Sequence, residues 1–381
     1  MTVALPPSVL SIILGTALVQ SANGLLQALL PLRLQATGFT TTDIGSVATA
    51  YGLGFVAGCL VVPFLVRRLG NVRAFAGLAV ATGLVVLLFA AADGLASWMA
   101  LRVASGLGMA GLFTVADSWV SAQARNADRG RVFALHMVGN RLALMLSPLG
   151  IGLGEVTGNS LLVAVAVLFA LALLPVAAVR GEPGSAGVPP GGLRGLLRAA
   201  PTALVGSFAV GLVNGPVTAM ATLYGVRVGL SPEGAALLIL ALQGGGLLMQ
   251  WPLGLLSDRF DRRLVLGAVA AGVAALSLLL MGLPAVSPPW VRYAAFAAFG
   301  ALALSSYALC VVLAGDTVGD DRMVGMVSVL LIAWSAGMML GPLPAAVLMD
   351  AFGPAGLFLH TAGVAALLTA FIATRAGQRA G

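Results

Sequence analysis

The sequence predicts an all-α integral membrane protein whose twelve transmembrane helices form two six-helix bundles. Hydrophobic residues make up 60% of its 381 residues and charged residues only 9%, whereas about a quarter of a soluble domain is charged. Long uncharged runs alternate with short loops that hold most of the charges. A stretch rich in Gly and Pro separates six of these runs from the other six.

The uncharged runs are long enough to cross a bilayer as helices. About 20 residues at 1.5 Å per residue cross a hydrocarbon core about 30 Å thick. Only helices and closed barrels satisfy the backbone in lipid, and these runs are too long for barrel strands. Two stretches, roughly 96–122 and 131–155, qualify although Arg102 and Arg141 fall inside them. The other ten are 1–32, 44–66, 74–92, 156–179, 199–226, 234–257, 264–291, 293–315, 323–349 and 351–374.

The middle of the chain predicts a division into two related halves. Residues 181–199 are dense in Gly and Pro, a composition typical of a linker that does not pack. We therefore expect one bundle over 1–180, a cytoplasmic linker, and a second bundle over 200–381. The order of short motifs also repeats between the halves, as Asp128-Arg129 before Ser147-Pro148 and as Asp321-Arg322 before Gly341-Pro342.

The distribution of arginines predicts the orientation in the membrane. An even number of helices places both termini on one side, and fifteen arginines fall in the loops and tails of that side. Only Arg33, Arg227 and Arg292 fall on the other. Cytoplasmic loops carry the excess of basic residues, so we expect both termini in the cytoplasm of a bacterium and the chain in its inner membrane. The first run lacks a basic start and a cleavage site, which indicates a first helix rather than a removed signal.

Two short charged loops carry related motifs. Gly254-x-Leu256-x-Asp258-Arg259-x-x-Arg262-Arg263 joins the runs 234–257 and 264–291. The segment from Pro63 to Arg73, which contains Arg67 and Arg68, joins the second and third runs in the same way. Such clusters between membrane-length runs predict tight loops at the membrane surface.

The six-plus-six organisation and this loop motif resemble the major facilitator superfamily, and Trp251-Pro-Leu-Gly254 is similar to its YcaD-like branch. Asp261 replaces the Gly usual in the loop motif. Segment Arg102–Gly108 resembles the fourth-helix motif of proton-coupled antiporters, and Gly337-x-x-x-Gly341-Pro342 resembles their fifth-helix motif but falls in the eleventh helix. The resemblance implies a secondary transporter and names no substrate.

Arg141 is the main candidate for substrate contact. It lies about ten residues from Arg131, which at 1.5 Å per residue is about 15 Å deep and near the midplane. A charge at that depth is costly and is expected to face a cavity, a partner or the bundle interior. We expect it to contact an anion or carboxylate; the alternative is a buried pair with an acid that the sequence does not locate.

Arg102 and Asp117 are the candidates for proton coupling. The resemblance implies that Arg102 tunes a proton site, and a structural arginine that ties helices together is the equal alternative. Asp117 and Asp316 close the fourth and tenth helices on the face that holds the loop arginines. Pairs that form in one access state and break in the other predict a gate there. The gate candidates are Arg68, Arg73, Gly254, Asp258, Arg259, Arg262, Arg263 and Asp316.

Polar and aromatic side chains inside the apolar runs are expected to line a cavity or to join helices. Asn23 and Gln27 are one turn apart and share a face. Ser305 and Ser306 are interpreted as joining helices, and His136 and His360 as packed. The further candidates for substrate binding are Asn140, Asn214, Gln243, Tyr307 and Trp334.

The motifs that are missing limit the function. No phosphate-binding Walker loop, metal cluster or nucleophile elbow is found, so neither an enzyme nor an ATP-driven pump is indicated and no cofactor is expected. The net charge of +7 reflects loop arginines and does not indicate nucleic-acid binding. We expect a monomeric transporter that works by alternating access on an anionic, zwitterionic or amphiphilic small molecule. The alternatives are proton-coupled efflux of hydrophobic compounds and a non-transporting scaffold or sensor.

Overall fold

The computed structural model describes residues 7–123, 129–177, 200–283, 287–316 and 320–377. These residues form helices joined by short loops, and no strand occurs among them. The predicted linker 181–199 lies outside the described residues.

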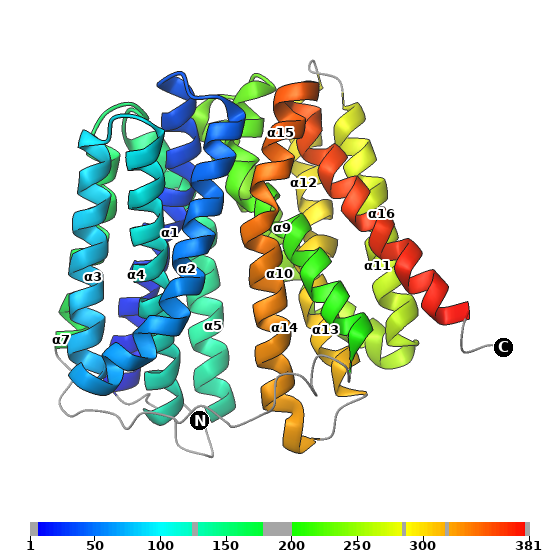
Figure 1. The fold of residues 1–381 in the computed structure, drawn as a ribbon, viewed down its shortest axis with the longest axis horizontal. Helices are drawn as coiled ribbons and strands as arrows, with labels where there is room; N and C mark the ends of the chain where they lie inside the picture. Colours follow the sequence, from blue (N-terminus) through cyan, green and yellow to red (C-terminus); the bar gives the residue numbers. More distant parts are fainter. Residues whose placement is uncertain (1–6, 124–128, 178–199, 284–286, 317–319, 378–381) are drawn as a thin grey trace. The chain divides into compact units, whose positions relative to one another are not determined.

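The first half of the chain forms six helical stretches, coloured from blue to green in Figure 1. Three of these stretches contain a 3-10 turn or a short break, so each of the three consists of two elements. The elements are α1 (Pro7–Ala36), α2 (Thr41–Leu69), α3 (Asn71–Leu88) with η1 (Phe89–Ala91), α4 (Leu95–Gln123), α5 (Arg129–Leu146) with η2 (Ser147–Leu153), and α6 (Ser160–Leu171) with α7 (Leu173–Ala177).

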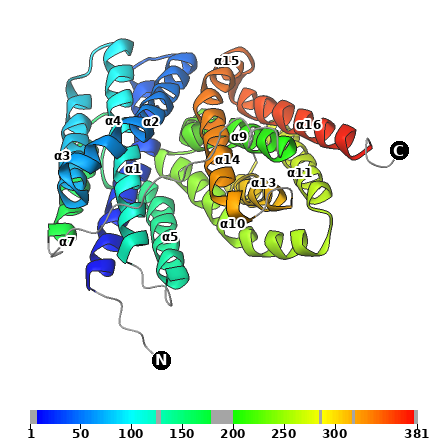
Figure 2. The same ribbon diagram turned by 60° about the horizontal axis from the view of Figure 1, so that its bottom comes forward.

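The second half also forms six stretches, two of them broken in the middle; Figure 2 shows them coloured from green to red. The breaks fall at Leu304-Ser305 and at Gly341-Pro342, where the proline has no N–H to continue the helix. The elements are α9 (Pro201–Arg227), α10 (Pro232–Arg259), α11 (Arg262–Gly282), α12 (Pro289–Ala303) with α13 (Ser306–Gly315), α14 (Asp320–Leu340) with α15 (Pro342–Phe352) and η3 (Gly353–Ala355), and α16 (Gly356–Gly377).

The helices have the length and polarity of membrane spans. Nine stretches of the described chain are long and apolar enough to cross a membrane, and one of them, Gly325–Arg375, covers two crossings that turn at Gly353–Ala355. Ser160–Val176 is a shorter apolar helix. With the broken helices joined, the arrangement agrees with the predicted all-α fold of twelve membrane helices.

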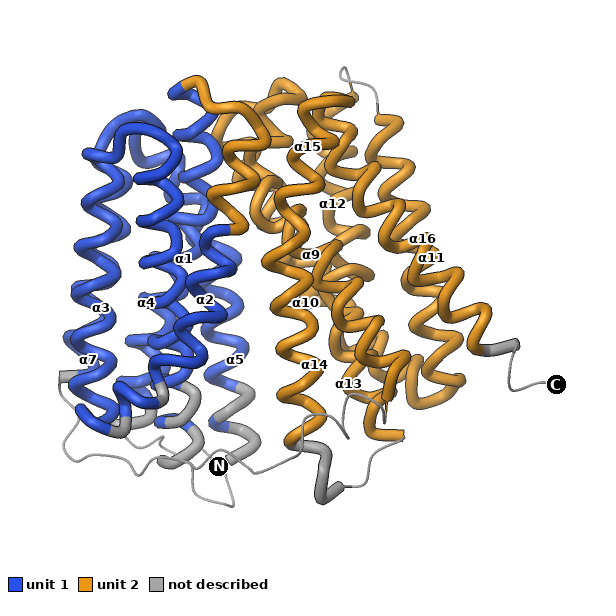
Figure 3. Tube along the Cα trace, viewed as in Figure 1, with its two compact units in different colours: residues 1–37, 50–188 blue, residues 38–49, 189–381 orange. Residues whose placement is uncertain are grey.

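The chain divides into two compact units that do not follow the sequence halves everywhere (Figure 3). Unit 1 comprises residues 1–37 and 50–188, and unit 2 comprises residues 38–49 and 189–381. Helix α2 therefore begins in unit 2 and continues in unit 1. The first nine residues of this helix were not expected to belong with the second half of the chain.

Glycines set the packing of α2 against α4 in unit 1. A Cβ on Gly54 would lie 1.9 Å from the carbonyl oxygen of Val103, and one on Gly106 would lie 2.2 Å from that of Tyr51. Small residues allow membrane helices to approach this closely, where backbone packing replaces side-chain packing. This close approach fixes the positions of the polar residues one turn away on each helix.

Very short loops join some neighbouring helices. Gly70 alone separates α2 from α3, and its φ of 80° suits a residue without a Cβ. In unit 2, only Phe260 and Asp261 separate α10 from α11. Both predicted surface loops are therefore tight turns.

A histidine compensates for a proline inside α9. Pro216 has no N–H to donate to the carbonyl of Leu212, four residues earlier in the helix. The Nε2 atom of His360, on α16, lies 3.1 Å from that carbonyl oxygen. The contact requires the tautomer that carries its proton on Nε2. His360 therefore joins α16 to α9 at the point where the backbone of α9 lacks a donor.

Candidate functional site

Arg102 stands at the centre of a polar cluster in unit 1. Its side chain is only 4% exposed. The Nη2 group donates to Oε1 of Gln27 at 2.7 Å, and the guanidinium carbon lies 4.4 Å from the centroid of the Tyr51 ring. The Tyr51 hydroxyl donates to Oδ1 of Asn23 at 3.4 Å. Two helices, α1 and α2, thus contribute neutral polar groups around one buried cation on α4.

The cluster leaves part of the Arg102 charge without a partner. The Nε and Nη1 atoms are buried and have no hydrogen-bond acceptor. No carboxylate forms an ion pair with this guanidinium among the described residues. The face of an aromatic ring attracts a cation by about 0.5–2 kcal/mol, which is less than the cost of a charge inside a bilayer. The arrangement can therefore accept a further hydrogen-bond acceptor or negative charge.

Helix packing explains why these residues meet. Arg102 precedes Gly106 by four residues, and Tyr51 precedes Gly54 by three, so each polar side chain lies about one turn from the closest approach of α2 and α4. The predicted pair of Asn23 and Gln27 does share a face of α1, and both residues contact the cluster.

Asn140 and Arg141 lie elsewhere on α5. Asn140 contacts a fully buried His136, with its Nδ2 atom 3.1 Å from Nε2 of the ring. The other ring nitrogen lies 3.4 Å from Oγ1 of Thr16, whose hydroxyl donates to the carbonyl of Ile12 at 2.9 Å. An Nδ1–H tautomer of His136 satisfies both contacts. Arg141 itself is half-buried.

The candidate residues of the second half include several buried polar atoms without a partner. The side chains of Asn214 on α9 and Gln243 on α10 are 3% and 6% exposed. Oδ1 of Asn214 has no hydrogen-bond donor. Tyr307 and Trp334 form a pair with ring centroids 5.6 Å apart, and neither the hydroxyl of Tyr307 nor Nε1 of Trp334 has a partner. These atoms are available to a polar ligand that reaches them.

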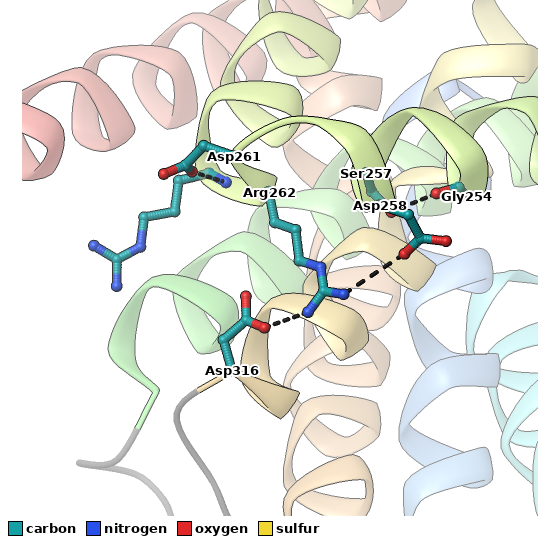
Figure 4. Close-up of polar contacts among 7 residues, drawn as sticks. Gly254, Ser257, Asp258, Asp261, Arg262 and Asp316 are labelled. Carbon is teal, nitrogen blue, oxygen red and sulfur yellow. Dashed lines mark hydrogen bonds and ion pairs between the residues drawn. The ribbon is translucent and has the colours of Figure 1, made fainter.

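The loop between α10 and α11 is ordered by its own side chains (Figure 4). Oδ1 of Asp261 accepts from the backbone N–H groups of Arg263 at 2.8 Å and of Leu264 at 3.3 Å. Asp261 is thus the N-cap of α11, and a carboxylate is favourable at a helix N-terminus. The departure from the usual Gly of the loop motif therefore supplies a cap to the following helix.

Arg262 bridges two acids of unit 2. It hydrogen-bonds to Asp316, and its Nη2 atom lies 3.6 Å from Oδ1 of Asp258. Arg262 is the first residue of α11 and Asp316 is the C-cap of α13, so each charge has the unfavourable sign for its own helix end. Pairing the two charges offsets both penalties and joins α11 to α13.

The other gate candidates make fewer described contacts. The guanidinium of Arg68 lies 4.3 Å from the centroid of the Phe64 ring, and Arg73 is exposed. A Cβ on Gly254 would meet open space, so nothing in its surroundings requires glycine. The side chain of Asp117, in α4, lies outside the described part of the chain. Arg259 is exposed and Arg263 half-buried.

The sequence profile of the Major Facilitator Superfamily matches residues 12–319 and again residues 203–379. The chain belongs to this superfamily. An uncharacterised MFS-type transporter of Enterobacter sp. (strain 638) is 29% identical over 377 residues, covering 97% of this chain and 96% of the relative. The uncharacterised MFS-type transporter YcaD of Salmonella newport is 28% identical over 381 residues with the same coverage. The predicted resemblance to the YcaD-like branch is confirmed.

Solved structures of membrane transporters share the fold. A mutant of the nucleoside transporter NupG superposes with a TM-score of 0.83 at 12% identity, covering 96% of this chain and 99% of that one. An inward-facing bacterial homologue of the lysosomal transporter Spinster gives 0.78 at 15% identity, with 98% and 96% covered. A D-xylose–proton symporter gives 0.71 at 14% identity, with 96% of each chain covered. The chain is therefore a multi-pass membrane transporter of the superfamily and not an enzyme.

Two features of this superfamily member were missed from the sequence. Tyr51, the ring under Arg102, is an aromatic residue in a run of apolar and small residues, and only its place three residues before Gly54 distinguishes it. The contact between Thr16 and His136 joins residues 120 positions apart. A single sequence does not indicate such a pairing.

Proposed function

We propose that the chain is a secondary active transporter of a small organic molecule that carries an anionic or zwitterionic group, and that it works by alternating access. The observation that supports the substrate class is the state of Arg102. It is a buried cation with neutral neighbours and with two nitrogen atoms that lack acceptors. A carboxylate or another strong acceptor on a substrate complements such a group.

Another arginine of unit 1 shows what a satisfied buried guanidinium looks like. Arg33 is 8% exposed; its Nη1 donates to the carbonyl of Gly158 at 2.6 Å and its Nη2 to Oδ1 of Asn159 at 3.0 Å. Those acceptors belong to the loop before α6, so the role of Arg33 is structural. Among the described residues, Arg102 has only Gln27 as an acceptor, which favours a ligand as its second one.

Access to Arg102 requires a conformational change. Its Nε and Nη1 atoms are closed off from solvent in the described conformation. An acceptor therefore reaches them only when the side chains that cover them move. We infer that Arg102 exchanges an internal contact for a substrate contact as the transporter changes state, and that Arg141 supplies a second positive charge to the substrate path. Binding energy that appears in only one state shifts the population toward it.

The remaining assignments complete the proposal. The chain lies in a bacterial inner membrane with both termini in the cytoplasm, residues 181–199 link two six-helix bundles, and the network of Asp258, Arg262 and Asp316 belongs to the cytoplasmic gate. Proteins of the same fold include a nucleoside transporter and a D-xylose–proton symporter. This likeness favours a polar organic substrate and makes proton coupling the second candidate mechanism.

The test begins with a ligand screen on purified protein, because a ligand that binds only the folded state raises the melting temperature, and the rise grows with ligand concentration relative to Kd. Each hit is then measured for flux in proteoliposomes, with and without an imposed pH gradient. Arg102→Gln is expected to abolish both binding and flux. Arg33→Gln, the matched change at a buried arginine with internal acceptors, is expected to lower stability and to leave affinity unchanged. Full affinity of Arg102→Gln for every hit would refute the substrate contact.

A further inference from the structure

Asp350 caps a helix that is remote from it in sequence. It lies near the end of α15, and its Oδ2 atom accepts from the backbone N–H of Thr42 at 2.8 Å and from its hydroxyl at 2.7 Å. Oδ1 accepts from the N–H of Thr41 at 3.2 Å. These N–H groups belong to the first turn of α2, where a helix has no internal acceptors and a partial positive charge.

Helix α2 already has a cap of its own. The N–H and the hydroxyl of Thr40 donate to Oδ2 of Asp43 at 3.0 and 2.7 Å. In return, the N–H of Asp43 donates to the hydroxyl of Thr40 at 3.1 Å. This reciprocal pair is a capping box, and it stabilises the start of the helix from within. Asp350 is therefore not required to form the helix, and its bonds serve to fasten the helix to α15.

Close packing accompanies the hydrogen bonds. A Cβ on Gly45 would lie 2.4 Å from the Cβ of Ala346 and 3.0 Å from the carbonyl oxygen of Pro342. Only glycine permits this approach. Thr41 and Ile44 are 0% and 1% exposed, so the side of the helix that carries them is covered.

The helix changes its surroundings along its length. Residues 38–49 belong to unit 2 and the rest of α2 belongs to unit 1. We propose that Asp350 and the surface around Gly45 form a releasable latch that holds the first two turns of α2 on α15. Any motion that carries α2 along with unit 1 must open this latch or bend the helix near Thr49. The bonds of Asp350 to Thr42 are exposed, so water can replace them when the latch opens.

The test measures how often the latch opens, with no substrate needed. Thr41→Cys places a buried reporter in the latch and preserves the backbone N–H that Asp350 binds. The background carries Cys59→Ser, because Cys59 is exposed, and retains the buried Cys310. Purified protein in lipid nanodiscs is reacted with a soluble maleimide. Asp350→Ala is expected to raise the labelling rate of the reporter by about tenfold or more, because it removes charge-assisted hydrogen bonds.

Asp43→Ala is the matched control. It removes the same charge from the same end of α2 but acts only within that helix, so labelling is expected to change less than about twofold. Gly45→Val opens the latch by steric clash and is expected to act as Asp350→Ala does. No rise with Asp350→Ala, or an equal rise with Asp43→Ala, would overturn the proposal. Labelling of the buried Cys310 reports unfolding. If Asp350→Ala raises the labelling of Cys310, the milder variant Asp350→Asn is used in its place. It is expected to raise the labelling rate at residue 41 by a smaller factor. The result does not depend on whether Arg102 binds substrate.

Discussion

The guanidinium carbon of Arg102 lies 4.4 Å from the centroid of the Tyr51 ring, inside a protein that crosses a membrane. Cation–π attraction and the bond to Gln27 hold the charge without an acid from the described residues. The contribution of the ring can be separated from that of its hydroxyl. Tyr51→Leu is expected to destabilise the fold by about 1–2 kcal/mol, whereas Tyr51→Phe retains the aromatic face and most of the stability. Thermal unfolding in one detergent compares the parent protein with the two variants. An equal loss of stability in Tyr51→Leu and Tyr51→Phe would exclude the cation–π role.

Arg141 is expected to differ from a structural arginine in the effect of its removal. Arg141→Gln should weaken substrate binding while the melting temperature stays close to that of the parent. Arg141→Lys keeps the charge and loses the planar fork that holds a carboxylate, so it should give intermediate affinity. Affinity and melting temperature are measured on the same three proteins with a ligand from the screen. Unchanged affinity of the Gln variant would show that Arg141 makes no contact with substrate.

Asp261 is expected to stabilise the start of α11. Asp261→Ala removes the N-cap and should cost about 1 kcal/mol, whereas Asp261→Ser retains a capping oxygen and Asp261→Gly costs only a few tenths. Hydrogen exchange of the amides of Arg263 and Leu264 reports the cap directly, because these are the groups that it binds. Faster exchange in Asp261→Ala than in Asp261→Ser is the expected result. Identical exchange in both would contradict the assignment.

The pair of Arg262 and Asp316 is expected to couple two helix ends. Both side chains are partly exposed, at 29% and 46%, so the coupling should be about 1 kcal/mol or less and should fall with added salt. A double-mutant cycle of Arg262→Gln and Asp316→Asn measures it. The exchanged pair, Arg262→Asp with Asp316→Arg, places each charge at its favoured helix end and should recover stability. Additive single-mutant effects at low salt would show that the pair contributes nothing.

His360 is expected to be structural. His360→Leu leaves the carbonyl of Leu212 without its donor inside the bundle and should cost about 1–3 kcal/mol. His360→Gln keeps an N–H that can reach the carbonyl and should cost less. The control removes the proline that creates the need for a donor. In a Pro216→Ala background, α9 supplies its own N–H to the carbonyl of Leu212, so His360→Leu should lower the free energy of unfolding by less. An unchanged penalty there would contradict the link between the two residues.

The number of helices was predictable because charge is costly in a bilayer. Uncharged runs bounded by Asp and Arg mark the membrane crossings, and the loop around Asp258 follows from the same rule. The depth of Arg102 and Arg141 could be counted along each helix. Which face of α4 carries Arg102 toward Asn23 and Gln27 could not, because this depends on how α4 rotates where Gly106 meets the backbone of α2.

Residues 38–49 show another limit of prediction from sequence. The uncharged run that begins at residue 44 predicts the second helix, and Thr40 and Asp43 have the spacing of a capping box at its N-terminus. Nothing local indicates that Asp350, 308 residues after Thr42, supplies a second cap. The contact becomes visible only when the helices are packed.

A single residue, Gly70, connects α2 to α3. Its φ of 80° is a backbone conformation that a residue with a Cβ rarely adopts, so this turn depends on glycine. With 29 residues at 1.5 Å each, α2 is about 44 Å long, with the latch at one end and this tight turn at the other. A shift of α2 along its own axis is therefore expected to displace Arg68 and the start of α3 together.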